Sequence, residues 1–280
     1  MKKIIAQILA AATLLTACNM PGAASQPTEV SPEASVEAPT VQPSGIRVSF
    51  QNVSFVIPEG LAGGATSELV PAVDESSGGP WGVAPQYIAF TLTDYTGRQD
   101  AFFNAVVNIY PAADYGAVNP WAEGSLTSLQ ALLASPDTPL TNDNLPSVPF
   151  NGAAAQQYAA QAKFISFHSG NGVGMISQYS QFPGPILKDN SFYHYEGLTS
   201  DGKYFIAALF PVLLPLQSAV GNPNADNLPN PYPGDISDTA ALTAYYQGIT
   251  DKLNTASLDS FEPSLTLLDE LIQSIAFAQP

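Results

Sequence analysis

The sequence predicts an α+β domain, in which helices pack on an antiparallel β-sheet built from hairpins. Three observations support this prediction: two pairs of strand-like segments flank short turn sequences, two helical segments follow near the C-terminus, and strands do not alternate with helices along the chain. Strands and helices gathered in separate runs are typical of the α+β class. Rossmann and TIM-barrel folds require a regular strand–helix alternation, which this sequence lacks.

The part of the domain before the hairpins is predicted to hold three strands and one helix. Segments rich in β-branched and aromatic residues, or with alternating apolar residues, are expected to be strands: residues 46–57, 86–93 and 101–110. Pro58 and Gly60 end the first strand, and residues 78–80, Gly-Gly-Pro, are expected to form a loop. Residues 121–134 place leucines at helical spacing and stop before Pro136, which predicts a helix.

Two hairpins are the clearest elements of the prediction. They pair residues 156–168 with 173–182 and residues 192–198 with 203–212, through turns at residues 169–172 and 199–202. The first turn reads Ser-Gly-Asn-Gly and the second Thr-Ser-Asp-Gly. Asn-Gly and Asp-Gly supply the positive φ angles that tight hairpin turns need.

The C-terminal part is predicted to be a loop followed by two helices. Residues 215–233 are rich in proline and asparagine and are expected to form the loop. The first helix is expected over residues 238–256, with Ser237 or Asp238 as its N-cap, and the second over residues 262–277, whose leucines and isoleucines fall on one face.

Two segments at the ends of the domain resemble a known fold family. Residues 53–60 read VSFVIPEG and residues 264–277 read SLTLLDELIQSIAF, around the hairpins. Together they are weakly similar to the PsbP/Mog1-like sandwich. The resemblance implies a binding or assembly module, because proteins of that group are mostly not enzymes.

The N-terminus has the organisation of a bacterial lipoprotein signal. Lys2 and Lys3 precede an apolar stretch that is too short to span a membrane comfortably. Residues 15–18 then read Leu-Thr-Ala-Cys, which resembles a lipobox. The resemblance implies that residues 1–17 are removed as a signal peptide and that Cys18 becomes the lipidated N-terminus. The alternative is an ordinary signal peptide with an incidental cysteine.

The segment after Cys18 is expected to act as a tether to a single domain. Residues 18–45 contain recurrent proline and glutamate but no aromatic or basic residue, so they cannot build a core. Residues 46–280 are long enough for one extracytoplasmic domain. The expected location is therefore the cell envelope, with the membrane bound through the lipid anchor.

Composition excludes several classes of function. The formal net charge is −16, which argues against non-specific nucleic-acid binding. The one cysteine excludes a disulfide framework or a multi-cysteine metal centre. The sequence carries no Walker-type phosphate loop, and we expect no cofactor. The expected partner besides the membrane is a small molecule or an envelope protein.

Candidate catalytic and metal-binding residues are few. His168 and His194 are the only histidines, each on an expected hairpin strand, where a structural role is the simpler interpretation. Oxygen ligands spaced by two residues resemble the start of an EF-hand loop and are weak calcium candidates: Asn222, Asn224 and Asp226. Asn227 and Pro233 stand where that loop has glycine and glutamate, which favours an ordinary turn-rich loop.

Aromatic residues gather on the second hairpin and give the candidate ligand-binding residues. Strand alternation places Tyr193 and Tyr195 on one face and Phe192, His194 and Glu196 on the other. One face must be core. An exposed opposite face would be a candidate ligand or partner surface, whereas two buried faces would mean that these residues stabilise the sheet.

These observations favour a lipid-anchored extracytoplasmic binding or assembly lipoprotein without catalysis of its own. Two alternatives stay open. The first is an envelope hydrolase that uses carboxylates with His168 or His194. The second is a purely structural envelope lipoprotein. Whether the chain is an enzyme is left undecided by the sequence, with the balance against it.

Overall fold

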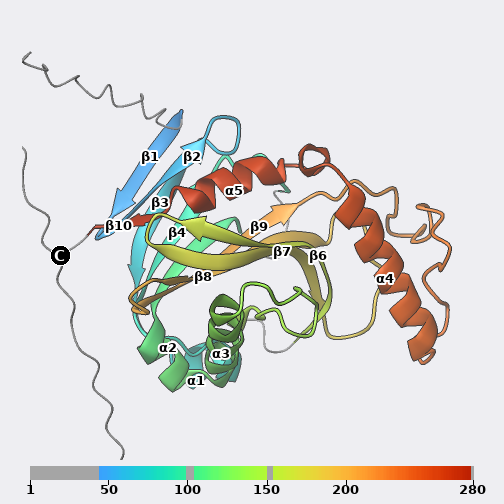
Figure 1. The fold of residues 1–280 in the computed structure, drawn as a ribbon, viewed down its shortest axis with the longest axis horizontal. Coiled ribbons are helices and arrows are strands. Elements are labelled where there is room, and N and C mark those ends of the chain that lie inside the picture. The colour runs from blue at the N-terminus through green and yellow to red at the C-terminus, as the bar shows by residue number, and fades with distance from the viewer. Residues whose placement is uncertain (1–43, 99–103, 150–153, 279–280) are drawn as a thin grey trace, which may run out of the picture. The chain divides into compact units, whose positions relative to one another are not determined.

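The computed structural model describes residues 44–98, 104–149 and 154–278, and Figure 1 labels the elements. The expected signal peptide, Cys18 and almost all of the tether lie outside these residues. No helix within the described ranges combines the length and apolar content needed to cross a bilayer.

The domain contains two antiparallel sheets, which confirms the α+β prediction. The larger sheet has seven strands in the spatial order β3 (Gly64–Val70), β4 (Tyr87–Thr93), β5 (Val106–Pro111), β9 (Tyr204–Val212), β8 (Ser191–Thr199), β7 (Gly170–Ser180) and β6 (Ala155–Phe167). The smaller sheet has three, in the order β1 (Gly45–Phe50), β2 (Val53–Pro58) and β10 (Ala276–Phe277).

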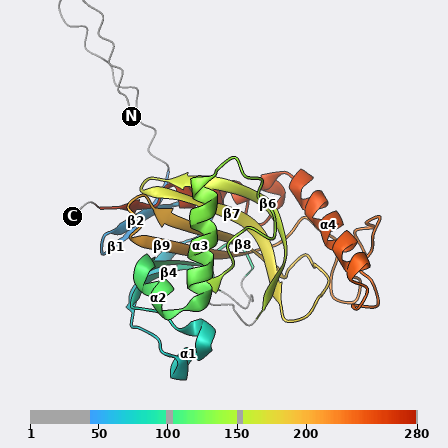
Figure 2. The same cartoon turned by 60° about the horizontal axis from the view of Figure 1, so that its bottom comes forward.

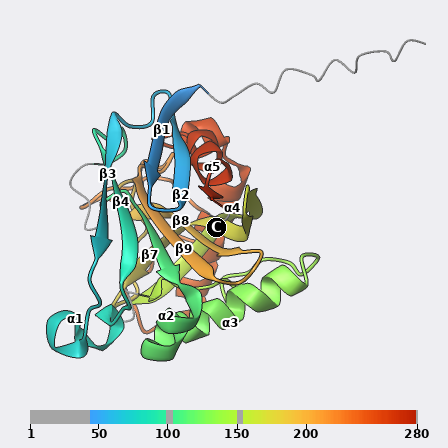
Figure 3. The same cartoon turned by 90° about the vertical axis from the view of Figure 1, so that its left-hand side faces the viewer.

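Both faces of the seven-stranded sheet are covered. The helices are α1 (Glu75–Gly82), α2 (Ala112–Val118), α3 (Pro120–Ala134), α4 (Thr239–Thr255) and α5 (Leu265–Gln273). One face packs against β2, α4 and α5, and the other packs against α2 and α3 (Figures 2 and 3). A short 3₁₀ helix, Leu258–Ser260, joins α4 to the segment before α5.

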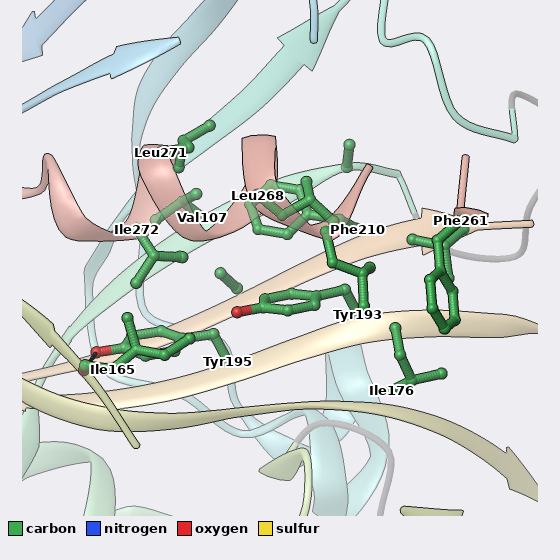
Figure 4. Packing of buried hydrophobic residues seen from close by; sticks show 14 of the residues in the cluster. Val107, Ile165, Ile176, Tyr193, Tyr195, Phe210, Phe261, Leu268, Leu271 and Ile272 are labelled. Atoms are coloured by element: carbon green, nitrogen blue, oxygen red, sulfur yellow. Dashed lines mark hydrogen bonds between the residues drawn. The ribbon is translucent and has the colours of Figure 1, made fainter. Parts of the chain in front are cut away.

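Apolar side chains of α5 close the main core. Leu268 and Ile272 lie on the side of the helix that faces Tyr193 and Phe210 on the central strands, and Leu271 belongs to the same buried cluster (Figure 4). All five are almost completely buried. Burial of a large apolar side chain contributes about 1.5–3 kcal/mol, so this helix is an integral part of the domain.

The segment expected as one strand over residues 46–57 is a hairpin, so that prediction was wrong. The strands β1 and β2 pair with Phe50 opposite Val53, and Gln51 adopts φ 54° in the turn between them. The apolar alternation changes phase between Phe50 and Val53, which is what a two-residue turn produces.

The first expected hairpin forms, but its turn is displaced. Phe167 pairs with Gly170, so His168 and Ser169 make the turn and the expected Asn-Gly pair lies within β7. The glycine is needed there for space. A Cβ atom on Gly172 would lie 2.2 Å from the carbonyl oxygen of Glu196 and 2.5 Å from the hydroxyl oxygen of Tyr195.

The second hairpin forms as predicted, with its turn at Ser200 to Gly202. Gly202 has φ 71°, which is the positive value that the Asp-Gly pair was expected to supply. Asp201 accepts hydrogen bonds from the hydroxyl of Thr199 and the backbone N–H of Lys203, and these hold the pKa of its carboxyl at about 2.

The expected helices are present with adjusted ends. Asp238 caps α4 by accepting a hydrogen bond from the N–H of Ala241. The terminal helix is shorter than expected: Ser264 is its N-cap, and the chain leaves it after Gln273 so that β10 can pair with β2. Residues 262 and 263 precede the helix.

Several elements were not predicted. Residues 78–80 lie within α1 rather than in a loop, with a break in helical geometry at Gly79 (φ 68°). The strand β3 and the helix α2 were also missed. The strand expected over residues 101–110 begins at Val106, and residues 99–103 lie outside the described part.

Candidate functional site

Tyr193 and Tyr195 lie in the main core, on one face of β8. The hydroxyl of Tyr193 donates to Asp269 Oδ1 at 2.8 Å, and that of Tyr195 donates to the carbonyl oxygen of Ile165 at 3.2 Å. Burial raises the pKa of both phenols above the ordinary value, and the Asp269 carboxylate adds to this for Tyr193. Both phenols therefore act as neutral hydrogen-bond donors inside the protein.

His194 and Glu196 lie on the opposite face of β8, beneath α3. Glu196 Oε1 is 2.9 Å from His194 Nε2, and Glu196 Oε2 accepts a 2.5 Å hydrogen bond from the hydroxyl of Ser125. Neither His194 nor Glu196 is exposed to solvent. The aromatic hairpin thus has two buried faces, so the condition for an exposed ligand surface is not met at these four residues.

The two histidines are not brought together. His168 is exposed in the turn between β6 and β7, where its backbone N–H donates a hydrogen bond to the carbonyl oxygen of Ile275. His194 is enclosed under α3. The hydrolase alternative needs a histidine near a carboxylate that a substrate can reach, and the Glu196–His194 pair is inaccessible in this conformation.

Two of the three calcium candidates, Asn224 and Asp226, are engaged in holding the loop and attaching it to α4, whereas Asn222 is exposed. Asp226 accepts hydrogen bonds from the N–H groups of Gln217 and Ser218 and forms a 2.8 Å ion pair with Lys252. Asn224 accepts from the N–H of Tyr232 at 2.7 Å. Within the described residues, no group of three or more His, Cys, Asp or Glu side chains is placed to hold a metal ion.

A groove lies elsewhere, between β6, α4 and the loop of residues 140–145. Its volume is about 830 Å³, within the range of small-molecule sites. In Figure 1, α4 lies along the side of the sheet formed by β6. Amide and hydroxyl groups dominate the lining: Thr141, Asn142, Gln157, Gln161, Thr243, Tyr246, Gln247, Thr250 and Asn254.

An irregularity in β6 places Gln161 at the junction with α4. The register with β7 shifts between Ala160 and Lys163, and Gln161 adopts φ 54°. Its N–H donates to Asn254 Oδ1 at 2.7 Å, while its side-chain Nε2 donates to the carbonyl of Leu253 at 2.7 Å. The bulge therefore fixes both amide side chains and attaches the end of α4 to the sheet edge.

Tyr246 is held at the groove by its hydroxyl group. This oxygen lies 3.0 Å from Gln157 Oε1 and accepts a 3.0 Å hydrogen bond from the N–H of Gly184. Partial burial raises the pKa of the phenol. The half-buried tyrosine is thus a rigid neutral group in the wall of the groove.

The groove has little net charge. Asp143 and Lys163 are the only charged residues among the described residues that line it. Lys163 forms an ion pair with Asp269. The other carboxylate oxygen of Asp269 accepts a hydrogen bond from the Tyr193 hydroxyl. The lysine charge is therefore balanced within the protein, and the groove presents mainly neutral hydrogen-bonding groups.

A second hollow of about 740 Å³ lies among the strand ends near the turns. His168, Lys203 and Asn52 are among its lining residues. Lys203 pairs with Asp201 at 3.0 Å, but both side chains are mostly exposed. An exposed ion pair contributes little energy, and this hollow offers less fixed structure than the groove.

Comparison of the chain with protein-family models, curated proteins and solved structures gave no match. The resemblances to a lipobox and to the PsbP/Mog1-like sandwich therefore stay predictions.

The groove residues were missed by sequence reasoning. Gln157 and Gln161 are polar residues within a segment of strand-like pattern, and Asn254 lies near the end of a predicted helix. No residue pattern in this segment signals the bulge at Gln161, which is non-glycine at positive φ. The convergence of these amides depends on α4 packing beside β6, which no local pattern specifies.

Proposed function

We propose that this protein is a lipid-anchored extracytoplasmic binding lipoprotein of the cell envelope and that the groove between β6 and α4 is its binding site. The observation that carries the proposal is the set of neutral amide and hydroxyl groups fixed around a groove of about 830 Å³. Sites for small ligands are concave and use a few well-placed polar groups. The lipobox-like residues and the proline-rich tether support the anchored location.

The buried state of His194 and Glu196 favours binding over hydrolysis. Glu196 is bonded to His194 and to the hydroxyl of Ser125 beneath α3, and both His194 and Glu196 are closed off from solvent. The groove itself contains Asp143 as its one carboxylate among the described lining residues. A glycosidase mechanism needs two carboxylates that face one bond.

The anchor is tested by metabolic labelling with palmitate in the host bacterium, followed by membrane fractionation. The natural chain is expected to carry the label and to sediment with membranes. Cys18→Ser is expected to lose the label, because the sulfur that accepts the lipid is removed. A Ser25→Ala variant serves as a control within the tether. Label retained by Cys18→Ser would contradict the anchor.

A further inference from the structure

We infer that the groove between β6 and α4 binds a neutral saccharide chain. This inference rests on the binding function proposed above and specifies the ligand class of the same site.

The charge of the groove selects against ionic ligands. Lys163 is already paired with Asp269, and Asp143 lies in the exposed loop on the other side. An anionic ligand would find no unpaired cation among the described lining residues. A cation would find one exposed carboxylate, which is too few oxygen ligands for selective binding. A neutral ligand matches this lining best.

The amides are fixed through one atom and leave the other atom for a ligand. Asn254 Oδ1 accepts from Gln161 N–H, Gln161 Nε2 donates to Leu253, and Asn142 Oδ1 accepts from Gln156 Nε2 at 3.0 Å. Hydrogen bonds among the described residues do not use Asn254 Nδ2, Gln161 Oε1 or Asn142 Nδ2. The groove therefore presents two donors and one acceptor whose side chains are already ordered.

A sugar hydroxyl suits this arrangement because it donates one hydrogen bond and accepts others. Neighbouring hydroxyls on a sugar ring can pair with a donor such as Asn254 Nδ2 and an acceptor such as Gln161 Oε1. Because these side chains are held in place, little rotamer entropy is lost on binding. The half-buried Tyr246 adds an amphipathic surface in the same wall.

The edge of β6 is a poor docking site for an extended peptide. Strand addition needs free backbone groups along a regular edge. Here the register of β6 shifts at residues 160–163, the N–H of Gln161 is bonded to Asn254, and α4 packs beside the strand. The structure therefore favours recognition by side chains, which suits a saccharide better than a peptide strand.

The test is isothermal titration of the purified full-length chain in detergent. The probes are chitotetraose, cellotetraose and maltotetraose as neutral saccharides, tetra-alanine as a peptide, and inorganic phosphate as an anion. At least one saccharide is expected to bind with a dissociation constant below about 1 mM, while the peptide and phosphate do not bind at that concentration.

Two groove variants and one matched control locate the binding. Asn254→Asp keeps the oxygen that caps Gln161 N–H but removes the Nδ2 donor. Asn142→Ala removes the other donor from an exposed loop. Each is expected to weaken saccharide binding by about three- to tenfold, the value of one hydrogen bond. Gln273→Ala, an exposed amide on α5 outside the groove, is expected to leave the affinity unchanged.

The failures of the two proposals are distinguishable. Groove-dependent binding of tetra-alanine or phosphate in place of the saccharides would overturn the saccharide inference and leave the binding function intact. Saccharide binding that both groove variants leave unchanged, with melting temperatures equal to that of the natural chain, would overturn the inference. No binding of any probe at 10 mM would contradict both proposals.

Discussion

Glu196 is the buried carboxylate that links α3 to the central sheet. It accepts a hydrogen bond from the hydroxyl of Ser125 on α3 and contacts His194 on its own strand. A buried acceptor that loses its partners costs more than the hydrogen bonds contributed, because the remaining groups stay desolvated. We therefore expect this side chain to contribute to the free energy of unfolding and not to contact a ligand.

Glu196→Gln tests that role. The substitution keeps the shape of the side chain but replaces one carboxylate oxygen with an NH₂ group, which cannot accept a hydrogen bond. We expect the free energy of unfolding to fall by about 1–3 kcal/mol in urea denaturation. The exposed Glu270→Gln is the control and is expected to change it by less than about 0.5 kcal/mol. An unchanged midpoint for Glu196→Gln would contradict this role.

Asp226 gives the domain an acid-sensitive contact between the long loop and α4. Burial alone would raise the pKa of this carboxyl, but hydrogen bonds from Lys252, Ser218 and the backbone outweigh it and lower the pKa below the ordinary value of 3.8. The folded protein therefore binds a proton at Asp226 less readily than the unfolded chain. Its contribution to stability is present above about pH 4 and is lost as the pH falls further.

We expect Asp226→Asn to lower the melting temperature at pH 6, because the ion pair with Lys252 is lost. The difference from the natural chain should shrink as the pH falls from about 4 toward 3, where the natural carboxyl takes up its proton. Melting curves between pH 3 and pH 7 measure this, with the exposed Asp137→Asn as control. A difference that stays constant over that range would contradict the assignment.

Among the elements, the pairing of β7 with β8 depends on glycines that face tyrosines. A Cβ atom on Gly172 would approach the Tyr195 hydroxyl and the carbonyl oxygen of Glu196 far inside contact distance. The carbonyl belongs to the paired strand, so it cannot move without breaking the ladder. The close approach explains why an Asn-Gly pair lies in a strand here.

Gly172→Ala is expected to destabilise the fold by about 3 kcal/mol, at the upper end of overpacking costs. Gly124→Ala is the matched control, because a Cβ atom there meets nothing within 4 Å and the residue lies in α3. This control is expected to raise stability by about 0.5–1 kcal/mol. Equal effects of the two substitutions in urea denaturation would contradict the packing argument.

The bulge at Gln161 attaches the end of α4 to the sheet edge. Gln161→Ala removes the side-chain hydrogen bonds to the carbonyls of Leu253 and Ala256. We expect faster amide hydrogen exchange in the last turns of α4 and unchanged exchange in β8 and β9. Gln247→Ala, whose side chain bonds to Asp251 within the helix, is the control. Unchanged exchange in α4 after Gln161→Ala would contradict this attachment.

Local patterns account for most elements but not for their junctions. The turn at Gly202 and the capping of α4 by Asp238 follow from turn and cap chemistry. The sequence predicted this turn and gave Asp238 as one of two candidate caps. The sequence placed the first turn at residues 169–172, whereas it lies at His168 and Ser169. Gly172 is needed because it packs against Tyr195 of the neighbouring strand, and a local sequence pattern does not show a contact between strands. The groove was missed for the same reason, since its amides come from β6, α4 and a loop that are distant in sequence.

At the scale of the whole molecule, the proposal combines a membrane anchor, a spacer and a domain with a neutral polar groove. The domain carries its stability in two cores on either side of the seven-stranded sheet. The groove lies at the β6 edge, where side chains are ordered by α4 without being enclosed. The groove can therefore be open to solvent without exposing the apolar residues of the two cores.

The most direct test of the binding site is NMR chemical-shift mapping on the isotope-labelled full-length chain, titrated with the saccharide that binds in calorimetry. We predict that the largest amide shifts fall at Asn142, Gln161, Tyr246 and Asn254, which come from the three elements around the groove. Shifts confined to the turns around His168 and Lys203 would place the ligand in the other hollow and contradict binding in the groove.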